Sequence, residues 1–301
     1  MYINKAYIIK TKTNLHVGSG DTNFGIVDNE IQRDTITNLP VINSSSLKGA
    51  IKDHFGDVLA QTNDIAIGSN FVKPFVFKTI FGDEQKTIDD DDKKTYDKLP
   101  KQGLVKFIDA KLLFLPLRSN KKPFYYVTSL ATLNEAKEFL QSFGIKLELD
   151  NIHTKNKSVA VDTEAATIED VECEALQADI SKIKTIFGIE NLAIFNDEDF
   201  NEAILSLPVI ARNCLENGKS VNLWYEEVLP RESILYTVLC YYNNLDDNRP
   251  DSKGKTDKKK FEMAYRLFED KLLKDAIQIG ANASIGYGIT HFSTIGTNNE
   301  Q

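Results

Sequence analysis

Apolar residues recur along this chain with two different periods, which separates expected strands from expected helices. Alternating or continuous apolar runs of strand length are typical of partly or fully buried strands. Such runs predict strands over residues 3–13, 103–116, 124–128, 234–242 and 289–292. Leu47, Ile51 and Phe55 instead recur every fourth residue. The helical period predicts helices after Ser46 and over 132–143 and 261–274.

The order of these elements indicates the fold class. A strand at 3–13, a helix, the strands 103–116 and 124–128, the helix 132–143 and a later strand follow the ferredoxin-like order. Thr132 and Glu135 have capping-box spacing, and Gly144 stands where a C-terminal cap belongs. We therefore expect an α+β protein with a ferredoxin-like (RRM-like) core.

Three segments interrupt this pattern within an expected single domain over residues 1–301. Residues 82–102 are rich in acidic side chains, which predicts a mobile surface loop. Residues 145–170 contain few large apolar side chains, which predicts an insertion or linker. Residues 207–230 place Asn217-Gly218 between two apolar stretches, a strong signal for a hairpin. A projecting β-hairpin is expected there.

Composition limits the class of protein. The chain has 301 residues, a formal net charge of −8 and three cysteines without CxxC spacing. Its apolar runs are shorter than the roughly 18 residues that span a membrane, and its start lacks a signal-peptide pattern. We expect a cytoplasmic protein with reduced cysteines and no membrane partner. The negative charge argues against indiscriminate nucleic-acid binding, although lysines cluster over 253–260.

Two glycine-containing loops are candidate anion sites. The first combines a Gly-Ser-Gly turn with the start of the first helix, where hydroxyls, an ammonium group and unpaired N–H groups suit a phosphate. Its members are Gly18, Ser19, Gly20, Ser44, Ser45, Ser46 and Lys48. An ordinary serine-capped helix explains the same pattern. The second loop contains Gly280, Gly286 and Gly288. It suits close approach to a phosphate, close approach to the N-terminal loop, or a simple turn.

Several motifs occur together in an order that is more specific than any one of them. They are His16-Val-Gly-Ser-Gly20, Gly25-Ile-Val-Asp28-Asn-Glu-Ile-Gln-Arg33, Leu39-Pro-Val-Ile, Ser45-Ser-Leu-Lys48-Gly49 and Asn222-Leu-Trp-Tyr-Glu-Glu. In this order they resemble the RAMP superfamily. More narrowly, they are similar to the backbone subunits of type III-B CRISPR effector complexes, the fourth subunit of the Cmr module.

The resemblance implies an antiviral protein that binds a crRNA guide and complementary target RNA. It also implies a filament with copies of itself, contacts with other effector subunits, and a thumb at 207–230 that distorts the duplex. It implies an endoribonuclease that uses Mg²⁺ or another divalent metal such as Mn²⁺, with Asp28 as base or metal ligand. Two alternatives stay open: a guide-binding scaffold without catalysis, and a related type III-A backbone subunit.

Further site residues follow from the resemblance and from local chemistry. His16 is a candidate helper acid or base, or a loop histidine bonded to main chain. Glu226 and Glu227 match a family acid pair at the thumb base, where one assists or pairs with a cation. Expected RNA contacts add Arg33, Arg118 and Arg212 to the two glycine loops. For Arg118 and Arg212, ion pairs with acidic side chains are the alternative.

Overall fold

The computed structural model of the protein describes residues 2–20, 27–61, 72–82, 102–243 and 255–295. The expected acidic loop 82–102 lies outside the described residues except for its two ends, and so does part of the lysine cluster. Within the described ranges, no helix combines the length and the apolar composition that crossing a membrane requires.

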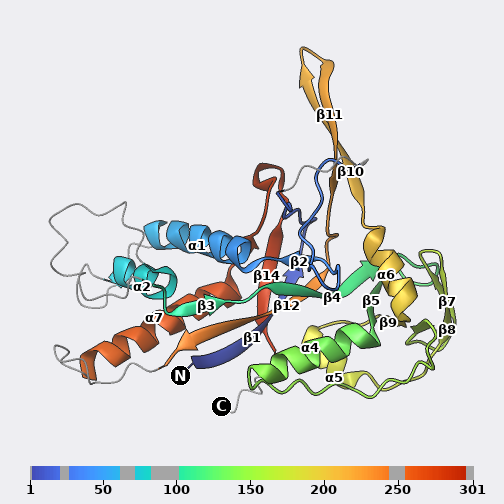
Figure 1. Ribbon diagram of the computed structural model, residues 1–301, viewed down its shortest axis with the longest axis horizontal. Coiled ribbons are helices and arrows are strands. Elements are labelled where there is room, and N and C mark those ends of the chain that lie inside the picture. Colours follow the sequence, from blue (N-terminus) through green and yellow to red (C-terminus); the bar gives the residue numbers. More distant parts are fainter. Residues whose placement is uncertain (1, 21–26, 62–71, 83–101, 244–254, 296–301) are drawn as a thin grey trace.

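A mixed β-sheet runs through the centre of the molecule, with helices on both of its faces (Figure 1). In spatial order its strands are β13 (Ile277–Gln278), β14 (Ile289–Thr294), β1 (Tyr2–Thr11), β12 (Ile234–Tyr242), β4 (Ala110–Leu117), β5 (Tyr125–Ser129), β9 (Leu192–Phe195), β6 (Val159–Ala160), β8 (Val171–Ala175) and β7 (Ala166–Ile168). Beside this path, β2 (Val41–Ile42) pairs with β4, and β3 (Val105–Phe107) pairs with β12.

Four neighbouring strands form the ferredoxin-like unit. They are β14, β1, β12 and β4, and each adjacent pair is antiparallel. The chain passes from β1 to β4 through α1 (Ser44–Gln61), and from β12 to β14 through α7 (Lys255–Lys274). The expected fold class is confirmed. Its second helix is α7, however, and not the helix near 132–143, because the long segment between β4 and β12 is inserted within the unit.

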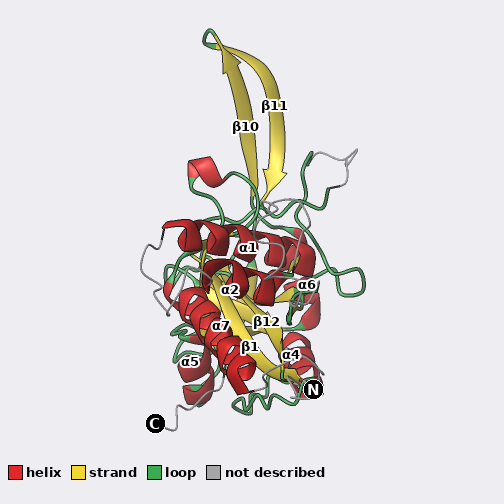
Figure 2. Ribbon diagram, turned by 90° about the vertical axis from the view of Figure 1, so that its left-hand side faces the viewer, coloured by secondary structure: helices red, strands yellow, loops and turns green. Residues whose placement is uncertain are grey.

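Alternate side chains of the central strands build two apolar cores, as the period of two in a strand requires. Tyr7 and Ile9 of β1 join the core beneath α1, α2 (Val72–Phe81) and α7. Ala6 and Ile8 join the core beneath α4 (Leu130–Ser142) and α5 (Ser181–Phe187). Figure 2 shows α1, α2 and α7 together on one side of the sheet.

Helix α4 begins at a different N-cap than expected, whereas its C-terminal end agrees with the expectation. Ser129 is the N-cap, and its side-chain oxygen accepts a hydrogen bond from the backbone N–H of Thr132. The expected capping box that starts at Thr132 is therefore wrong, since Thr132 already lies in the first helical turn. At the other end Gly144 has a φ of 76°, which confirms the expected glycine cap.

The long strand expected over 103–116 is divided into β3 and β4. The interruption lies at Ile108 and Asp109. There the Asp109 side chain accepts a hydrogen bond from the backbone N–H of Ser44, at 2.6 Å. The apolar sequence pattern continues past Asp109, but the strand is interrupted where the Asp109 carboxylate binds the start of α1.

Residues 145–170 are packed into the protein, so that of the two expected alternatives, an insertion or a linker, the insertion describes this segment. Leu147 and Ile152 are buried in the core beneath α4 and α5. The short strands β6 and β7 of this segment join the extended sheet. Each contributes so few residues that the usual apolar signal of a strand is weak.

A two-stranded hairpin projects from the body of the molecule (Figures 1 and 2). It follows α6 (Asp197–Leu205) and consists of β10 (Val209–Glu216) and β11 (Lys219–Glu227). Asn217 and Gly218 at its tip have φ angles of 49° and 77°. Two positive φ angles are what a tight type I′ turn requires, so the hairpin expected over 207–230 is confirmed.

Candidate nuclease site at the base of the hairpin

Asp28 lies beside the base of the projecting hairpin and its side chain is exposed. Its backbone N–H donates to the carbonyl of Tyr225 at 3.1 Å. The Tyr225 N–H in turn donates to Asp28 Oδ2 at 2.8 Å. These two bonds attach the Asp28 segment to β11 and fix one oxygen of the carboxylate against main chain.

His16 is buried and binds the end of β11. Its Nδ1 lies 2.7 Å from the carbonyl oxygen of Glu227. Because a carbonyl only accepts, we assign the proton of this hydrogen bond to Nδ1. A Cβ at Gly18 would lie 3.3 Å from Nε2, so glycine keeps space next to this nitrogen. His16 is thus a loop histidine bonded to main chain, and its Nε2 is the ring nitrogen next to the space that Gly18 keeps.

Glu227 ties the base of the hairpin to the segment that follows Asp28. One carboxylate oxygen forms a short ion pair with Arg33, and the other accepts from the backbone N–H of Ile31 at 3.1 Å. Arg33 also donates to the carbonyl of Ile204 at the end of α6. Both expected site residues are therefore held in structural bonds.

Glu226 has a comparable role on the opposite face of β11. Its carboxylate accepts from Arg212 Nε at 3.0 Å, from Trp224 Nε1 at 2.8 Å and from Asn282 Nδ2 at 2.9 Å. Burial raises the pKa of Glu226, but these hydrogen bonds outweigh burial and hold it below its usual value. The guanidinium of Arg212 lies 4.5 Å from the ring centre of Tyr287.

The expected phosphate-binding side chains around α1 lie in the same region. Ser44, Ser45 and Ser46 form the first turn of the helix, and Ser45 is exposed. The Ser46 hydroxyl accepts from Gln32 Nε2 at 3.1 Å. The Lys48 ammonium donates to the carbonyl of Phe81, the last residue of α2, at 3.1 Å. Lys48 thus has a protein partner in addition to any contact with RNA.

Arg118 lies apart from this region. It forms two hydrogen bonds with the Glu169 carboxylate, at 3.0 and 2.8 Å, between the end of β4 and the turn after β7. Arg118 and Arg212 both form ion pairs with acidic side chains, Arg118 with Glu169 and Arg212 with Glu226, which was the alternative to an RNA contact. The pKa of Arg118 is raised by its hydrogen bond to Glu169.

The two glycine loops meet each other at the hairpin base. The N–H of Ala281 donates to the carbonyl of His16 at 2.8 Å. A Cβ at Gly280 would lie 2.3 Å from that same carbonyl oxygen, and a Cβ at Gly288 would lie 1.9 Å from the carbonyl oxygen of Ile279. Close approach between chain segments therefore explains Gly280 and Gly288. The turn of Gly18, Ser19 and Gly20 is exposed, as is Gly286.

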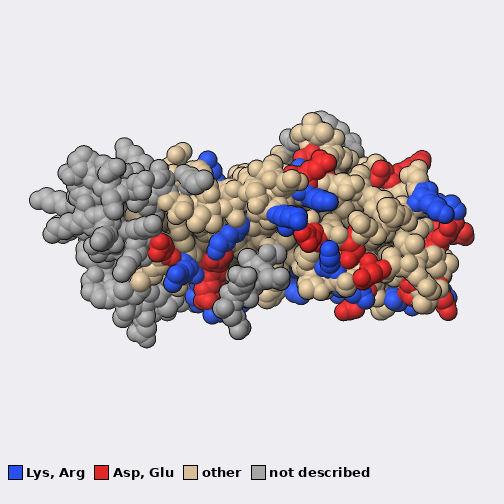
Figure 3. Space-filling model, turned by 90° about the horizontal axis from the view of Figure 1, so that it is seen from below, with Lys and Arg blue, Asp and Glu red and all other residues tan. Residues whose placement is uncertain are grey.

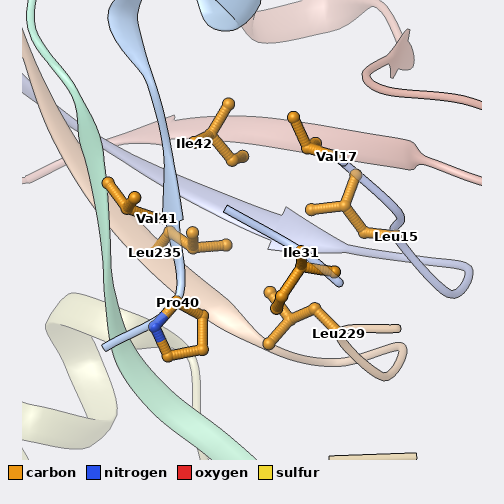
Figure 4. Close-up of a pocket in the computed structure, with 8 residues that line it drawn as sticks. All are labelled: Leu15, Val17, Ile31, Pro40, Val41, Ile42, Leu229 and Leu235. Carbon is orange, nitrogen blue, oxygen red and sulfur yellow. The ribbon is translucent and has the colours of Figure 1, made fainter. Parts of the chain in front are cut away.

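A small apolar pocket underlies the loop that carries His16 (Figure 4). It is lined by Leu15, Val17, Ile31, Pro40, Val41, Ile42, Leu229 and Leu235. With apolar side chains alone it has no chemical group for catalysis. We interpret it as the packing that holds the His16 loop, the segment after Asp28 and the exit of the hairpin together.

Sequence reasoning missed three residues of this region, namely Gln32, Asn282 and Tyr287. Gln32 accepts from the backbone N–H of Asn43 and donates to Ser46, so it links the Asp28 segment to α1. Asn282 has a left-handed φ of 64°. The glycine-rich sequence around Asn282 indicates a turn, but it does not show which distant residue the Asn282 side chain contacts.

The described residues contain no group of three or more His, Cys, Asp or Glu side chains arranged to hold a metal ion. Asp28 supplies one exposed carboxylate. Mg²⁺ commonly binds through one or two carboxylates together with substrate phosphates and water. The residues therefore fit a cation that is held jointly with RNA, and they do not form an all-protein metal cage.

The face of the molecule away from the hairpin carries charged side chains of both signs (Figure 3). Figure 3 shows described acidic and basic side chains interspersed there. Such a mixture creates no strong field for a polyanion. The candidate site is therefore the hairpin side, where the exposed carboxylate, the Gly-Ser-Gly turn and the start of α1 come together.

Comparison with curated proteins identifies two relatives. The "CRISPR system Cmr endoribonuclease Cmr4" of Pyrococcus furiosus is 29% identical, over 94% of this chain and 94% of the relative. The "CRISPR system CMR subunit Cmr4" of Saccharolobus solfataricus is 28% identical, over 65% of this chain and 62% of the relative.

Solved structures show the same fold. A chain of the type III-B Cmr-beta complex in its apo state, studied by cryo-EM, matches with a TM-score of 0.69 at 23% identity, covering 98% of both chains. The crystal structure of oligomeric Cmr4 from Pyrococcus furiosus matches with a TM-score of 0.65 at 22% identity, covering 98% of this chain and 99% of the other. The family model of the RAMP superfamily matches residues 8–291. Since that match spans nearly all of the chain, this protein belongs to the RAMP superfamily.

Proposed function

We propose that this protein is a crRNA-binding backbone subunit of a type III-B CRISPR effector complex that cleaves guide-complementary target RNA in the cytoplasm. The observation that carries the proposal is the exposed Asp28 carboxylate, fixed by Tyr225 at the base of a projecting hairpin. A relative that this chain matches over 94% of the relative's length is named an endoribonuclease. Copies of this chain and other effector subunits are the proposed protein partners.

The proposed reaction needs no covalent enzyme intermediate. The ribose 2′-oxygen attacks the adjacent phosphorus and its proton passes to a base. The bond to the 5′-oxygen of the next nucleotide breaks with its electron pair going to that oxygen, which takes a proton from water, so that a 2′,3′-cyclic phosphate and a 5′-hydroxyl are formed. Asp28 is the exposed carboxylate at the site, and His16, whose Nε2 takes no part in the bond to Glu227, is the second candidate. Mg²⁺ or Mn²⁺, when bound, would neutralise phosphate charge, and Asp28 is the carboxylate available to hold it.

The hairpin suits the role of a thumb that separates bases. Val221, Leu223 and Tyr225 alternate along β11 and therefore share one face, with 53%, 54% and 38% of their surface exposed. Apolar side chains inserted between bases unstack and kink a duplex. A base displaced beside Asp28 leaves its sugar–phosphate backbone free to rotate toward in-line attack.

Proposed contacts to guide RNA are independent of sequence. The Ser45 hydroxyl and the Lys48 ammonium are donors on the hairpin side, where the Gly18–Gly20 turn and Gly286 are exposed. The backbone N–H groups of Ser19 and Gly286 donate to the carbonyls of Glu30 and Ala283. Contacts of this type hold phosphates and do not read bases, which suits a protein that accepts any guide. Arg33 and Arg212 support this surface through their ion pairs.

The test is cleavage of guide-complementary RNA by the reconstituted complex with Mg²⁺. Asp28→Asn keeps an oxygen to accept the Tyr225 N–H but removes the charge. We expect cutting to fall by about a hundredfold or more while target affinity stays within about twofold. Asp170→Asn, in the exposed turn between β7 and β8, is the matched control and should cut normally. Unchanged cutting by Asp28→Asn would contradict the assignment, and absence of cutting by the wild type would indicate a guide-binding scaffold.

A further inference from the structure

Two separate sets of side chains hold the hairpin to the body. Glu227 and its ion pair with Arg33 lie on one face of β11. On the other face, Arg212 and Trp224 form a cross-strand pair next to Glu226. That second face is attached to the C-terminal glycine loop, through Asn282 and Tyr287. Neither Asp28 nor His16 donates or accepts a hydrogen bond in this second attachment.

The second attachment is largely buried, and Arg212 binds Glu226 through Nε while its buried Nη2 has no hydrogen-bond partner among the described residues. The side chains of Arg212 and Glu226 are 18% and 8% exposed. Asn282 donates to the same oxygen, Glu226 Oε2, that accepts from Arg212. A carboxylate that receives donors from both strands and from a separate loop fixes the angle between them, since moving any partner breaks a charge-assisted bond.

This attachment is adjacent to the bonds that orient Asp28. Tyr225, whose N–H and carbonyl both bind Asp28, stands between Trp224 and Glu226 in β11. The attachment therefore holds the residues on each side of the contact that fixes Asp28. Further out, β10 and β11 form a sheet with each other alone among the described strands.

We propose that Asn282, Arg212 and Tyr287 are positioning residues that, through Glu226 and β11, set the orientation of the Asp28 carboxylate toward the scissile phosphate. The inference rests on the proposed nuclease function. It gives the C-terminal glycine loop a part in cleavage that is distinct from binding phosphate. Glycine at position 280 is needed for the loop to reach the hairpin base, because a side chain there would collide with the His16 carbonyl.

The sharpest variant is Asn282→Asp. Asparagine and aspartate have the same shape, and both tolerate the left-handed φ of 64° at this position. The substitution replaces a donor to Glu226 with a second carboxylate, which repels it. Asn156→Asp is the matched control, because Asn156 is exposed in another part of the chain and has a φ of 60°.

Two measurements are made on each variant. The first is single-turnover cleavage and target affinity in the reconstituted complex. The second is hydrogen exchange of the Tyr225 amide, which donates to Asp28, in the purified protein. We expect Asn282→Asp to slow cleavage on the order of ten- to a hundredfold, to leave target affinity within about twofold, and to speed exchange of this amide. Asn156→Asp should change none of the three.

Unchanged exchange of the Tyr225 amide in Asn282→Asp would overturn the proposal, and so would faster exchange with normal cleavage. A loss of target affinity as large as the loss of rate would also overturn it, since that result indicates general damage or an RNA contact. If the wild-type complex does not cut, the proposed nuclease function fails. The exchange measurement still decides whether the loop holds β11 against Asp28.

Discussion

At the scale of single residues, Arg33 and Arg118 show how burial decides what an ion pair is worth. The Arg33 and Glu227 side chains are 15% and 8% exposed, whereas the Arg118 side chain is 85% exposed. Removing one partner of a buried pair leaves an uncompensated charge, while an exposed pair is solvated with or without its partner. Arg33 also bonds the end of α6, so it joins the two chain segments that enter and leave the hairpin base.

We therefore predict that Arg33→Ala lowers the free energy of unfolding by about 3–5 kcal/mol, because it strands the Glu227 carboxylate. Urea denaturation of the purified protein measures this change. Arg118→Ala is the matched control and should leave the denaturation midpoint unchanged. Equal effects of the two substitutions would show that the Arg33 pair is as solvated as the Arg118 pair.

At the scale of elements, the hairpin depends on its turn because it packs little against the body. Gly218 has a φ of 77°, and a Cβ at this position would meet no neighbouring atom. Gly218→Ala should therefore cost about 1–2 kcal/mol from backbone strain alone. We expect the loss to appear as faster hydrogen exchange of β10 and β11 amides, with little change in the global melting temperature.

Gly49→Ala provides the comparison for this turn. Gly49 lies inside α1, and a Cβ there also has open space around it. Alanine at a helical position should stabilise the protein by about 0.5–1 kcal/mol. The same substitution thus has opposite signs at the two sites. Slower exchange of the hairpin amides in Gly218→Ala would contradict the left-handed turn.

At the scale of the whole molecule, buried tyrosines set an alkaline limit to stability. Tyr7, Tyr126, Tyr236, Tyr241 and Tyr265 all have raised pKa values, chiefly because of burial. Burial, followed by the hydrogen bond to Asp162, raises the pKa of Tyr125 to about 12. In the unfolded chain a tyrosine ionises at its ordinary pKa of 10.0. The folded state therefore retains protons that the unfolded state has already lost, and stability falls as pH rises.

We predict that the free energy of unfolding decreases between about pH 10 and pH 12, and that Tyr125→Phe makes this decrease shallower. Below pH 10 the variant should differ from the wild type by a constant amount, the value of the lost hydrogen bond to Asp162. Urea denaturation at a series of pH values measures both effects. A difference that stays constant up to pH 12 would show that Tyr125 ionises alike in both states.

The predictable parts of the fold are those whose signal is local. The helix that contains Leu47, Ile51 and Phe55, the Asn217-Gly218 turn and the Gly144 cap depend on neighbouring residues, and the structure confirms all three. The break at Asp109 and the strands within 145–170 depend on partners far away in sequence. Periodicity carries no information about such partners.

In the candidate site, too, some features are predictable from local sequence and others depend on distant partners. The motifs around Asp28, His16 and Glu226 were recognised from residue order alone. Whether the glutamates are free or paired depends on Arg33, Arg212 and Asn282, which approach from other segments. No sequence pattern singled out Asn282 or Tyr287, because their significance lies in what they face.

By itself the sequence determined the α+β class, the helices α1, α4 and α7, the longer strands, the hairpin and the family, because backbone preferences, side-chain periodicity and motif order are properties of short stretches of chain. It did not predict α2, α5 and α6. Tertiary structure alone decided that α7 completes the ferredoxin-like unit and that two glycine loops meet at His16. It also decided that Arg33 and Arg212 are held by carboxylates beside Asp28. These features arise from contacts between segments separated by up to most of the chain, and such contacts are set by how the whole sheet buries its two faces.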